Sequence, residues 1–220
     1  QWVKKNWGWL IANVLAFLPL LGVLALINID ISGNGSFLTF DIPSRMGEGG
    51  RGLSHAKSMF WFPIHSTGEW AIRWLTVSLT ITPLAILFRW KKSTRYRKLF
   101  GLYAFLYSFL HLIFYIADKG FLEIFSETNL ILGLIATAVM IALAMTSNNK
   151  AKQILKKKWK SLHRLIYPAA ILAILHVALL EKGSWAVYAV IIAIGYVIRT
   201  PVIRSPLERI RKGRRQAIAA

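Results

Sequence analysis

The sequence contains no cysteine and only nine acidic residues among its 220 residues. Without cysteine, the chain cannot form disulfides, ligate zinc through thiolates, hold an iron–sulfur cluster or attach a c-type haem covalently. It also lacks the HExxH, GxSxG and P-loop motifs that mark metalloproteases, serine hydrolases and nucleotide-binding enzymes. Because the few acids lie outside the apolar segments, nothing in the sequence predicts an active site for hydrolysis.

Long apolar runs make up most of the chain, which is 55% hydrophobic. Six of these runs are long enough, or nearly so, to cross about 30 Å of hydrocarbon as helices. Helices are expected at residues 7–27, 70–88, 99–117, 130–146, 162–180 and 185–199, with an outer loop at 28–64. The predicted fold is an all-α, polytopic membrane bundle of about six transmembrane helices, formed by residues 1–220 as one domain.

The 28 Lys and Arg residues give a net charge of +19, which in a soluble domain would suggest nucleic acid as a partner. Their positions argue against nucleic acid. If both termini lie on one side of the membrane, 22 of the 28 basic residues lie on that side and eight of the nine acids on the other. Basic residues concentrate in cytoplasmic loops, so we expect both termini in the cytoplasm and an attraction of the basic loops to anionic membrane lipid.

Two histidines lie inside predicted helices at matching depth. His111 lies about 9 Å inside the outer end of the third run, and His176 about 6 Å inside the outer end of the fifth. A titratable side chain in an apolar span is costly unless it is used. Imidazoles on two facing helices can hold a haem iron from opposite sides. We therefore expect axial ligation of haem iron, the alternative being two histidines that are satisfied by neighbouring carbonyls.

His163 begins the fifth run among lysines, about 20 Å of helix rise from His176. That separation would place His163 at a second centre near the inner face. On an ideal helix the two side chains would point about 140° apart, although Pro168 between them can change the winding. The alternative is an interfacial histidine with no ligand role.

His65 begins the second run and shares one helix face with Glu69 and Arg73. Near a haem, Arg73 could contact a propionate, and His65 could be a ligand or a hydrogen-bond donor. The alternative is an ordinary surface ion pair beside a histidine. His55, in the outer loop, is expected to be solvated.

Several short motifs together resemble one family. They are HSTGEWAIR at 65–73, TP at 82–83, RKLFGL at 97–102, YSFLH at 107–111, ALAMTS at 142–147 and WKSLHRLIY at 159–167, followed by His176. On these residues the chain resembles the MsrQ (YedZ) family, the haem-binding membrane subunits of the bacterial protein-methionine-sulfoxide reductase system. That family belongs among the ferric-reductase-like transmembrane domains, and the resemblance covers residues 65–199.

The resemblance implies an electron-transfer subunit of the bacterial inner (plasma) membrane rather than a catalytic subunit. It implies one or two haem b groups, with FMN as a candidate second cofactor. Electrons would come from the quinone pool or a cytoplasmic flavin reductase and would pass to a periplasmic molybdopterin reductase of the MsrP type. Carried over by position, His111 and His176 would ligate the outer haem iron, and His163 would serve an inner centre.

The chain departs from the wider family at one informative place. Ferric reductases and NADPH oxidases carry a further histidine before the one in the third helix, where this chain has Arg97 and Lys98. An inner bis-histidine haem would therefore lack one ligand. Two other functions stay open: a transmembrane ferric or cupric reductase that acts directly on metal ions, and a small transporter or scaffold without haem, whose histidines serve a proton or ligand path.

Overall fold

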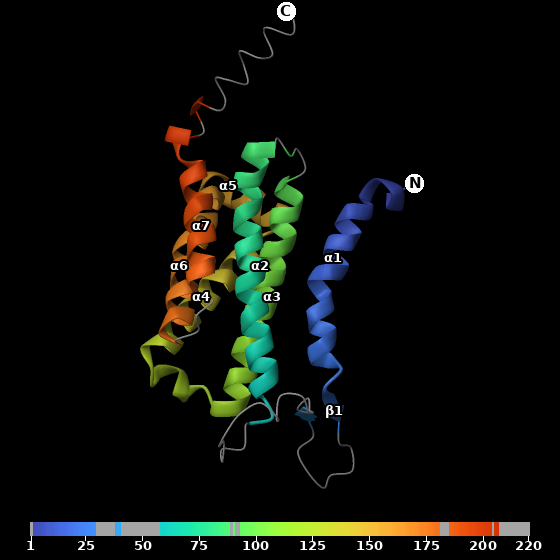
Figure 1. Ribbon diagram of the computed structural model, residues 1–220, viewed down its shortest axis with the longest axis vertical. Helices are drawn as coiled ribbons and strands as arrows, with labels where there is room; N and C mark the ends of the chain where they lie inside the picture. The colour runs from blue at the N-terminus through green and yellow to red at the C-terminus, as the bar shows by residue number, and fades with distance from the viewer. Residues whose placement is uncertain are drawn as a thin grey trace, which may run out of the picture.

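The computed structural model describes residues 2–29, 38–40, 58–88, 90, 93–180, 185–203 and 205–206. Helices dominate this part of the chain (Figure 1). In order, the elements are α1 (Trp2–Leu24), β1 (Ile27–Ile29), β2 (Leu38–Phe40), α2 (Trp61–Phe88), α3 (Ser93–Lys119), η2 (a 3-10 helix, Leu122–Phe125), α4 (Thr128–Met145), α5 (Asn149–His163), α6 (Ile166–Leu179) and α7 (Trp185–Arg199). The two strands form a short antiparallel pair in which Ile27 lies opposite Phe40.

Four helices, α1 to α4, are long and apolar enough to cross a membrane. A further candidate consists of α5 and α6 together, bent by 41° at the break between them, and α7 is a shorter apolar helix. Leu, Ile, Val and Phe side chains are exposed along α1, α6 and α7, as expected of helices that face lipid. The prediction of an all-α, polytopic membrane bundle is confirmed.

Helix α2 begins at Trp61, nine residues before the start expected from the apolar run. The Ser58 hydroxyl accepts a hydrogen bond from the Phe60 N–H at 3.1 Å, and Pro63 lies in the first turn, where proline suits a helix start. The polar residues that follow this turn, at positions 65–69, lowered the hydropathy and hid the helix. His65 therefore lies within α2. Most of the expected outer loop, including His55, lies outside the described residues.

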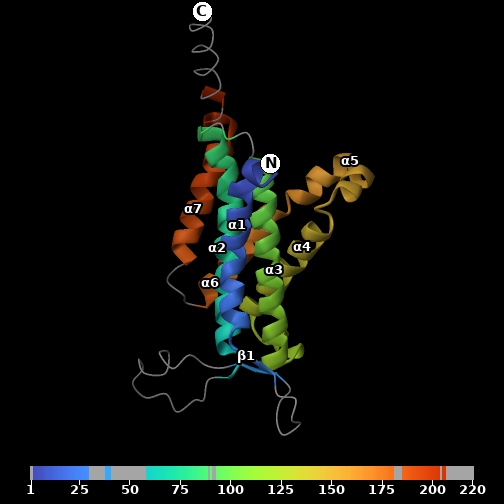
Figure 2. The same ribbon diagram turned by 90° about the vertical axis from the view of Figure 1, so that its right-hand side faces the viewer.

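The fifth predicted run, 162–180, is interrupted at residues 164–165: its first two residues end α5 (Asn149–His163), and α6 (Ile166–Leu179) forms most of the rest. Residues 149–163 were expected to form a basic loop leading into that run, but they form the amphipathic helix α5. The Asn148 side chain caps this helix by accepting a hydrogen bond from the Ala151 N–H at 2.8 Å. Lys156 interrupts α5 with a φ of 46°. No α5 residue is buried, and the helix projects sideways from the end of α4 (Figure 2). The many lysines of α5 make this segment polar, which explains why it was not expected to be a helix.

The bundle is built around the long α2–α3 pair, with α4 packed on α6 and α7 packed on α2. Its core cluster consists of Leu75, Leu79, Ala104, Met140 and Ala170. Helix α1 lies at the edge of the bundle (Figure 1) and is tied to α3 by two tyrosine hydroxyls. The two ends differ in charge: the acidic end holds the start of α2 and η2, and the basic end holds the start of α3 and α5.

Candidate functional site

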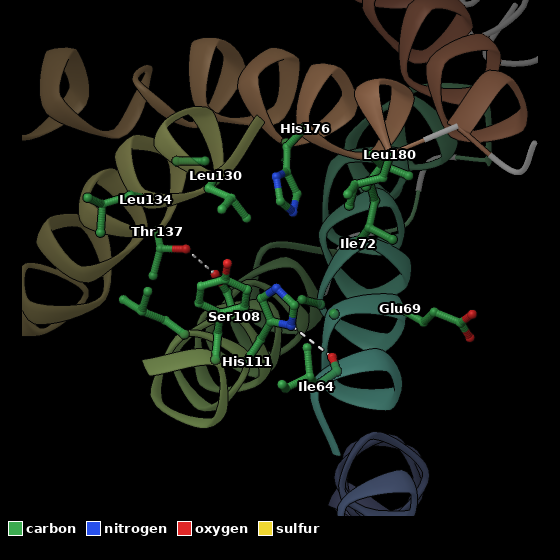
Figure 3. Close-up of a pocket in the computed structure, with 18 of the residues that line it drawn as sticks. Ile64, Glu69, Ile72, Ser108, His111, Leu130, Leu134, Thr137, His176 and Leu180 are labelled. Carbon is green, nitrogen blue, oxygen red and sulfur yellow. Dashed lines mark hydrogen bonds between the residues drawn. The ribbon is translucent and has the colours of Figure 1, made fainter. Parts of the chain in front are cut away.

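A cavity of about 360 Å³ lies between α2, α3, α4 and α6, towards the acidic end (Figure 3). Most of its lining is apolar, including Ile72, Leu75, Leu112, Leu134, Met140 and Val177. A concave, largely apolar site with a few polar groups is typical of a cofactor pocket. We call it the histidine cavity because two imidazole rings enter it.

His111 from α3 and His176 from α6 meet inside this cavity, so the structure brings together the two histidines that were expected at matching depth. Their ring centres are 6.3 Å apart, and their planes are inclined by 72°. Figure 3 shows both rings directed into the cavity from opposite walls. The break before α6 does not disturb this arrangement, because it lies well away from His176.

Each imidazole is anchored by a backbone carbonyl. His111 Nδ1 lies 2.8 Å from the Ile64 carbonyl oxygen, and His176 Nδ1 lies 2.7 Å from that of Asn129. A carbonyl oxygen can only accept, so Nδ1 carries the proton and the ligating lone pair is on Nε2. Such a bond fixes the tautomer and orientation of a metal-ligating histidine. The two interpretations left open by the sequence, carbonyl partners and metal ligation, are thus compatible.

Two glycines allow the rings to approach the helix backbones. A Cβ atom on Gly68 would lie 3.0 Å from the His111 ring, and one on Gly133 would lie 3.0 Å from His176 Nδ1. Each glycine lies one helical turn after the residue whose carbonyl anchors the ring. Both imidazoles therefore rest in the same kind of notch, formed by a carbonyl and the following glycine.

The two notches repeat along the sequence. Adding 65 to the positions of Ile64, Gly68 and His111 gives Asn129, Gly133 and His176, and in both bonds the partners are 47 residues apart. Neither the two glycines nor the two carbonyls were expected from the sequence. The recurrence of a glycine and a histidine at one fixed spacing was the signal that could have revealed them.

The histidine pair fits a haem iron. An iron between the rings would lie about 2 Å from each nitrogen, taking imidazole–metal distances as a guide, and each nitrogen lies about 1 Å from its own ring centre. These four lengths add to about 6 Å, close to the observed 6.3 Å between ring centres. Within the described residues, no group of three or more His, Asp or Glu side chains could hold a metal ion without further ligands. The four nitrogens of a porphyrin would supply such ligands.

The other residues expected near the outer haem are placed less centrally. His65 lines the histidine cavity and stacks on Trp61, with ring centres 4.9 Å apart. Arg73 donates to the Glu69 carboxylate at 2.8 Å and lies over the Trp70 ring, and it is not part of the lining. In Figure 3 the Glu69 carboxylate is directed away from the cavity. The structure thus places Arg73 in a surface ion pair.

One polar pair crosses the cavity wall. The hydroxyls of Ser108 on α3 and Thr137 on α4 are 2.7 Å apart, and both residues are buried (Figure 3). Interhelical hydrogen bonds of this kind hold membrane helices in register. The pair joins the helix that carries His111 to the helix that anchors His176.

His163 lies apart from the other two, in a second cavity of about 590 Å³ at the basic end. Its ring stacks on Trp159 with centres 4.0 Å apart, its Nδ1 lies 3.1 Å from the Trp159 carbonyl, and its Nε2 lies 3.4 Å from the Ser147 hydroxyl. The lining of this cavity includes no second imidazole within the described part of the chain. Met140 borders both cavities.

Comparisons with known proteins agree with this architecture. The family model described as ferric reductase like transmembrane component matches residues 67–174, a range that includes His111 and ends two residues before His176. The chain is 35% identical over 159 residues to the protein-methionine-sulfoxide reductase heme-binding subunit MsrQ of Rhodospirillum rubrum, a match that covers 67% of this chain and 74% of the relative.

A second relative is the subunit of the same name from Xanthomonas euvesicatoria pv. vesicatoria, 38% identical over 140 residues. That match covers 59% of this chain and 64% of the relative, just under two thirds of its length. No solved structure matches the chain.

Proposed function

The chain belongs to the MsrQ family, and from that premise we propose that it is a membrane electron carrier whose b-type haem is held by His111 and His176. The observation that supports this proposal best is the spacing of the two imidazole rings, 6.3 Å between centres, inside an apolar cavity. This spacing suits one iron between two nitrogens.

The side chains around the cavity would each have a defined task. When bound, a haem supplies reversible one-electron transfer at a fixed depth in the membrane. His111 and His176 would hold the haem iron together, which would favour electron transfer over the binding of small ligands. The carbonyls of Ile64 and Asn129 orient the rings and raise the basicity of Nε2. The apolar lining excludes water and so contributes to the reduction potential.

The partners follow from the family and from the charges at the two ends. The relatives are named as subunits of protein-methionine-sulfoxide reductases, so we propose a methionine sulfoxide reductase of the periplasmic molybdopterin type (MsrP-like) as the acceptor at the acidic end. With the basic end in the cytoplasm and the chain in the bacterial inner membrane, the donor is the quinone pool or a cytoplasmic flavin reductase. FMN is a further candidate cofactor.

We propose one haem, between His111 and His176. His163 as a ligand of an inner centre stays a prediction, since its cavity offers one imidazole in the described residues. Direct reduction of ferric or cupric ions is a second candidate function, because the matching family model is named for ferric reductases. Reduction of a ferric chelate by the isolated, pre-reduced protein would favour it.

Visible spectroscopy of purified protein tests the proposal. The wild type, oxidised and dithionite-reduced, should show the sharp bands of low-spin haem b. His111→Ala and His176→Ala should each lose these bands or shift them to high spin, whereas His163→Ala, which removes a histidine 4.0 Å from Trp159 in the other cavity, should keep them. A wild-type protein that stays colourless after haem is supplied during expression would contradict the electron-carrier proposal.

A further inference from the structure

The second cavity, at the basic end, has an unusual lining. Six cationic side chains contribute to it, from the start of α3, from α5 and from the turn after α5: Arg95, Arg97, Lys98, Lys152, Lys160 and Arg164. Its described lining includes no acidic residue. We call it the basic cavity.

These cations have only neutral partners in the described part of the chain. Arg95 donates to the Asn6 side chain at 2.6 Å, Arg97 lies 3.5 Å from the Thr82 hydroxyl, and Lys152 lies over the Trp159 ring. The two ion pairs of the described residues, at Glu69 and Asp118, are at the other end of the bundle. The mutual repulsion of the cations is therefore not offset by carboxylates in the described protein.

The helix geometry adds to this positive potential. Both α3 and α5 begin at the basic cavity, and neither has an acidic residue in its first turn. A helix N-terminus carries a partial positive charge and presents unpaired backbone N–H groups. Two such ends beside six cations make a site that selects an anion.

Part of the wall of the basic cavity is apolar and aromatic. It is formed by Leu102, Met140, Leu143, Ile166, Trp159 and Tyr167. Around it, Met145 on α4 and Ile154 on α5 are 72% and 78% exposed, as is usual for side chains in contact with lipid. The occupant should therefore combine an anionic head with an apolar body.

We propose that the basic cavity binds the phosphate group of an anionic phospholipid, with its acyl portion against the apolar wall. Basic pockets between membrane helices are suited to such head groups. The site is separate from the histidine cavity, and the proposal does not depend on haem.

The test compares two pairs of lysines on the same helix. Lys152 and Lys160 line the basic cavity, whereas Lys157 and Lys158 on α5 do not. Delipidated full-length protein would be titrated with phosphatidylglycerol or phosphatidylcholine and observed by native mass spectrometry. The wild type should prefer phosphatidylglycerol. Lys152→Gln/Lys160→Gln should weaken its binding roughly 25-fold, about fivefold for each cation lost. Lys157→Gln/Lys158→Gln, with the same charge change, should weaken it by much less.

Two outcomes would overturn the proposal. One is a lack of selectivity: the wild type binds both lipids equally, or the two double variants lose phosphatidylglycerol binding equally. Either result would show diffuse electrostatic attraction instead of a site. The other is lysine-dependent binding of FMN or inorganic phosphate that displaces the lipid, which would identify a soluble phosphate as the ligand. Absorbance of the same samples reports haem independently, so a failed haem test would leave this result intact. Size-exclusion profiles confirm that both variants fold.

Discussion

The imidazole planes of His111 and His176 cross at 72°, because each ring is oriented by a carbonyl on a different helix. Ile64 on α2 sets the first ring and Asn129 on α4 sets the second. The angle between the rings thus follows from how α2 and α4, which carry the two carbonyls, pack in the bundle.

A near-perpendicular ring pair should be visible in the electron paramagnetic resonance spectrum of the oxidised protein. Crossed axial imidazoles leave two iron d orbitals close in energy, so low-spin ferric haem should give a highly anisotropic signal with one large g value. Parallel rings would give a rhombic spectrum instead, and that result would contradict the geometry reported for His111 and His176.

The glycine notches predict specific spectral effects. Gly68→Ala and Gly133→Ala each introduce a methyl group about 3.0 Å from an imidazole, so the ring must shift and its iron bond should weaken. Each variant should show a partial shift to high-spin haem and a changed midpoint potential.

The matched control for these variants is Gly22→Ala in α1, where an added Cβ meets nothing within 4 Å. In a helix, replacing glycine by alanine otherwise stabilises by up to about 1 kcal/mol, so the control should keep its spectrum and gain slightly in stability. Wild-type spectra and potentials in both notch variants would show that the close approach has no effect on ligation.

The Ser108–Thr137 bond should couple α3 to α4. Ser108→Ala or Thr137→Val leaves one buried hydroxyl without its partner across the helix interface. A double-mutant cycle on unfolding in detergent should give a coupling energy of about 0.6 kcal/mol, and up to about 1.7 kcal/mol. Additive losses would mean that the two hydroxyls make no net contribution together.

Arg199 should be important for the packing of α7. Its guanidinium donates to the Tyr167 hydroxyl at 2.5 Å and to the Leu79 carbonyl, which connects α7 to α6 and α2. Arg199→Gln should lower the free energy of unfolding by about 1.5–3 kcal/mol, as for hydrogen bonds to a charged group. Arg199→Lys should restore only part of the loss, because lysine lacks the planar fork.

Thermal unfolding in detergent measures this effect, and Tyr167→Phe is the companion variant, since it removes one of the two acceptors. A Tyr167→Phe protein as unstable as Arg199→Gln would assign the whole effect to the tyrosine bond and none to the Leu79 carbonyl.

The helices and the histidine pair could be predicted because both depend on one-dimensional properties of the chain. Apolar length marks a membrane helix, and depth along two such helices placed His111 and His176 at one level. The pairing of their helices follows from packing, yet matching depth was sufficient to suggest that the two rings meet.

The remaining features depend on contacts between segments that are distant in the sequence. The notch glycines Gly68 and Gly133 have no local sequence pattern that distinguishes them from ordinary helix glycines, because each leaves space for an imidazole ring from another helix. The start of α2 and the whole of α5 were missed for a different reason: hydropathy does not detect a polar or amphipathic helix. The local signals available were Asn148, which caps α5, and Ser58, whose hydroxyl accepts from the Phe60 N–H just before α2.

The repeated notch bears on the direction of electron transfer. His111 and His176 are supported alike, each by one carbonyl and one glycine. If these two histidines hold the haem as proposed, nothing in their support would favour one direction of electron transfer. The reduction potentials of the donor and the acceptor would then determine the direction of electron flow.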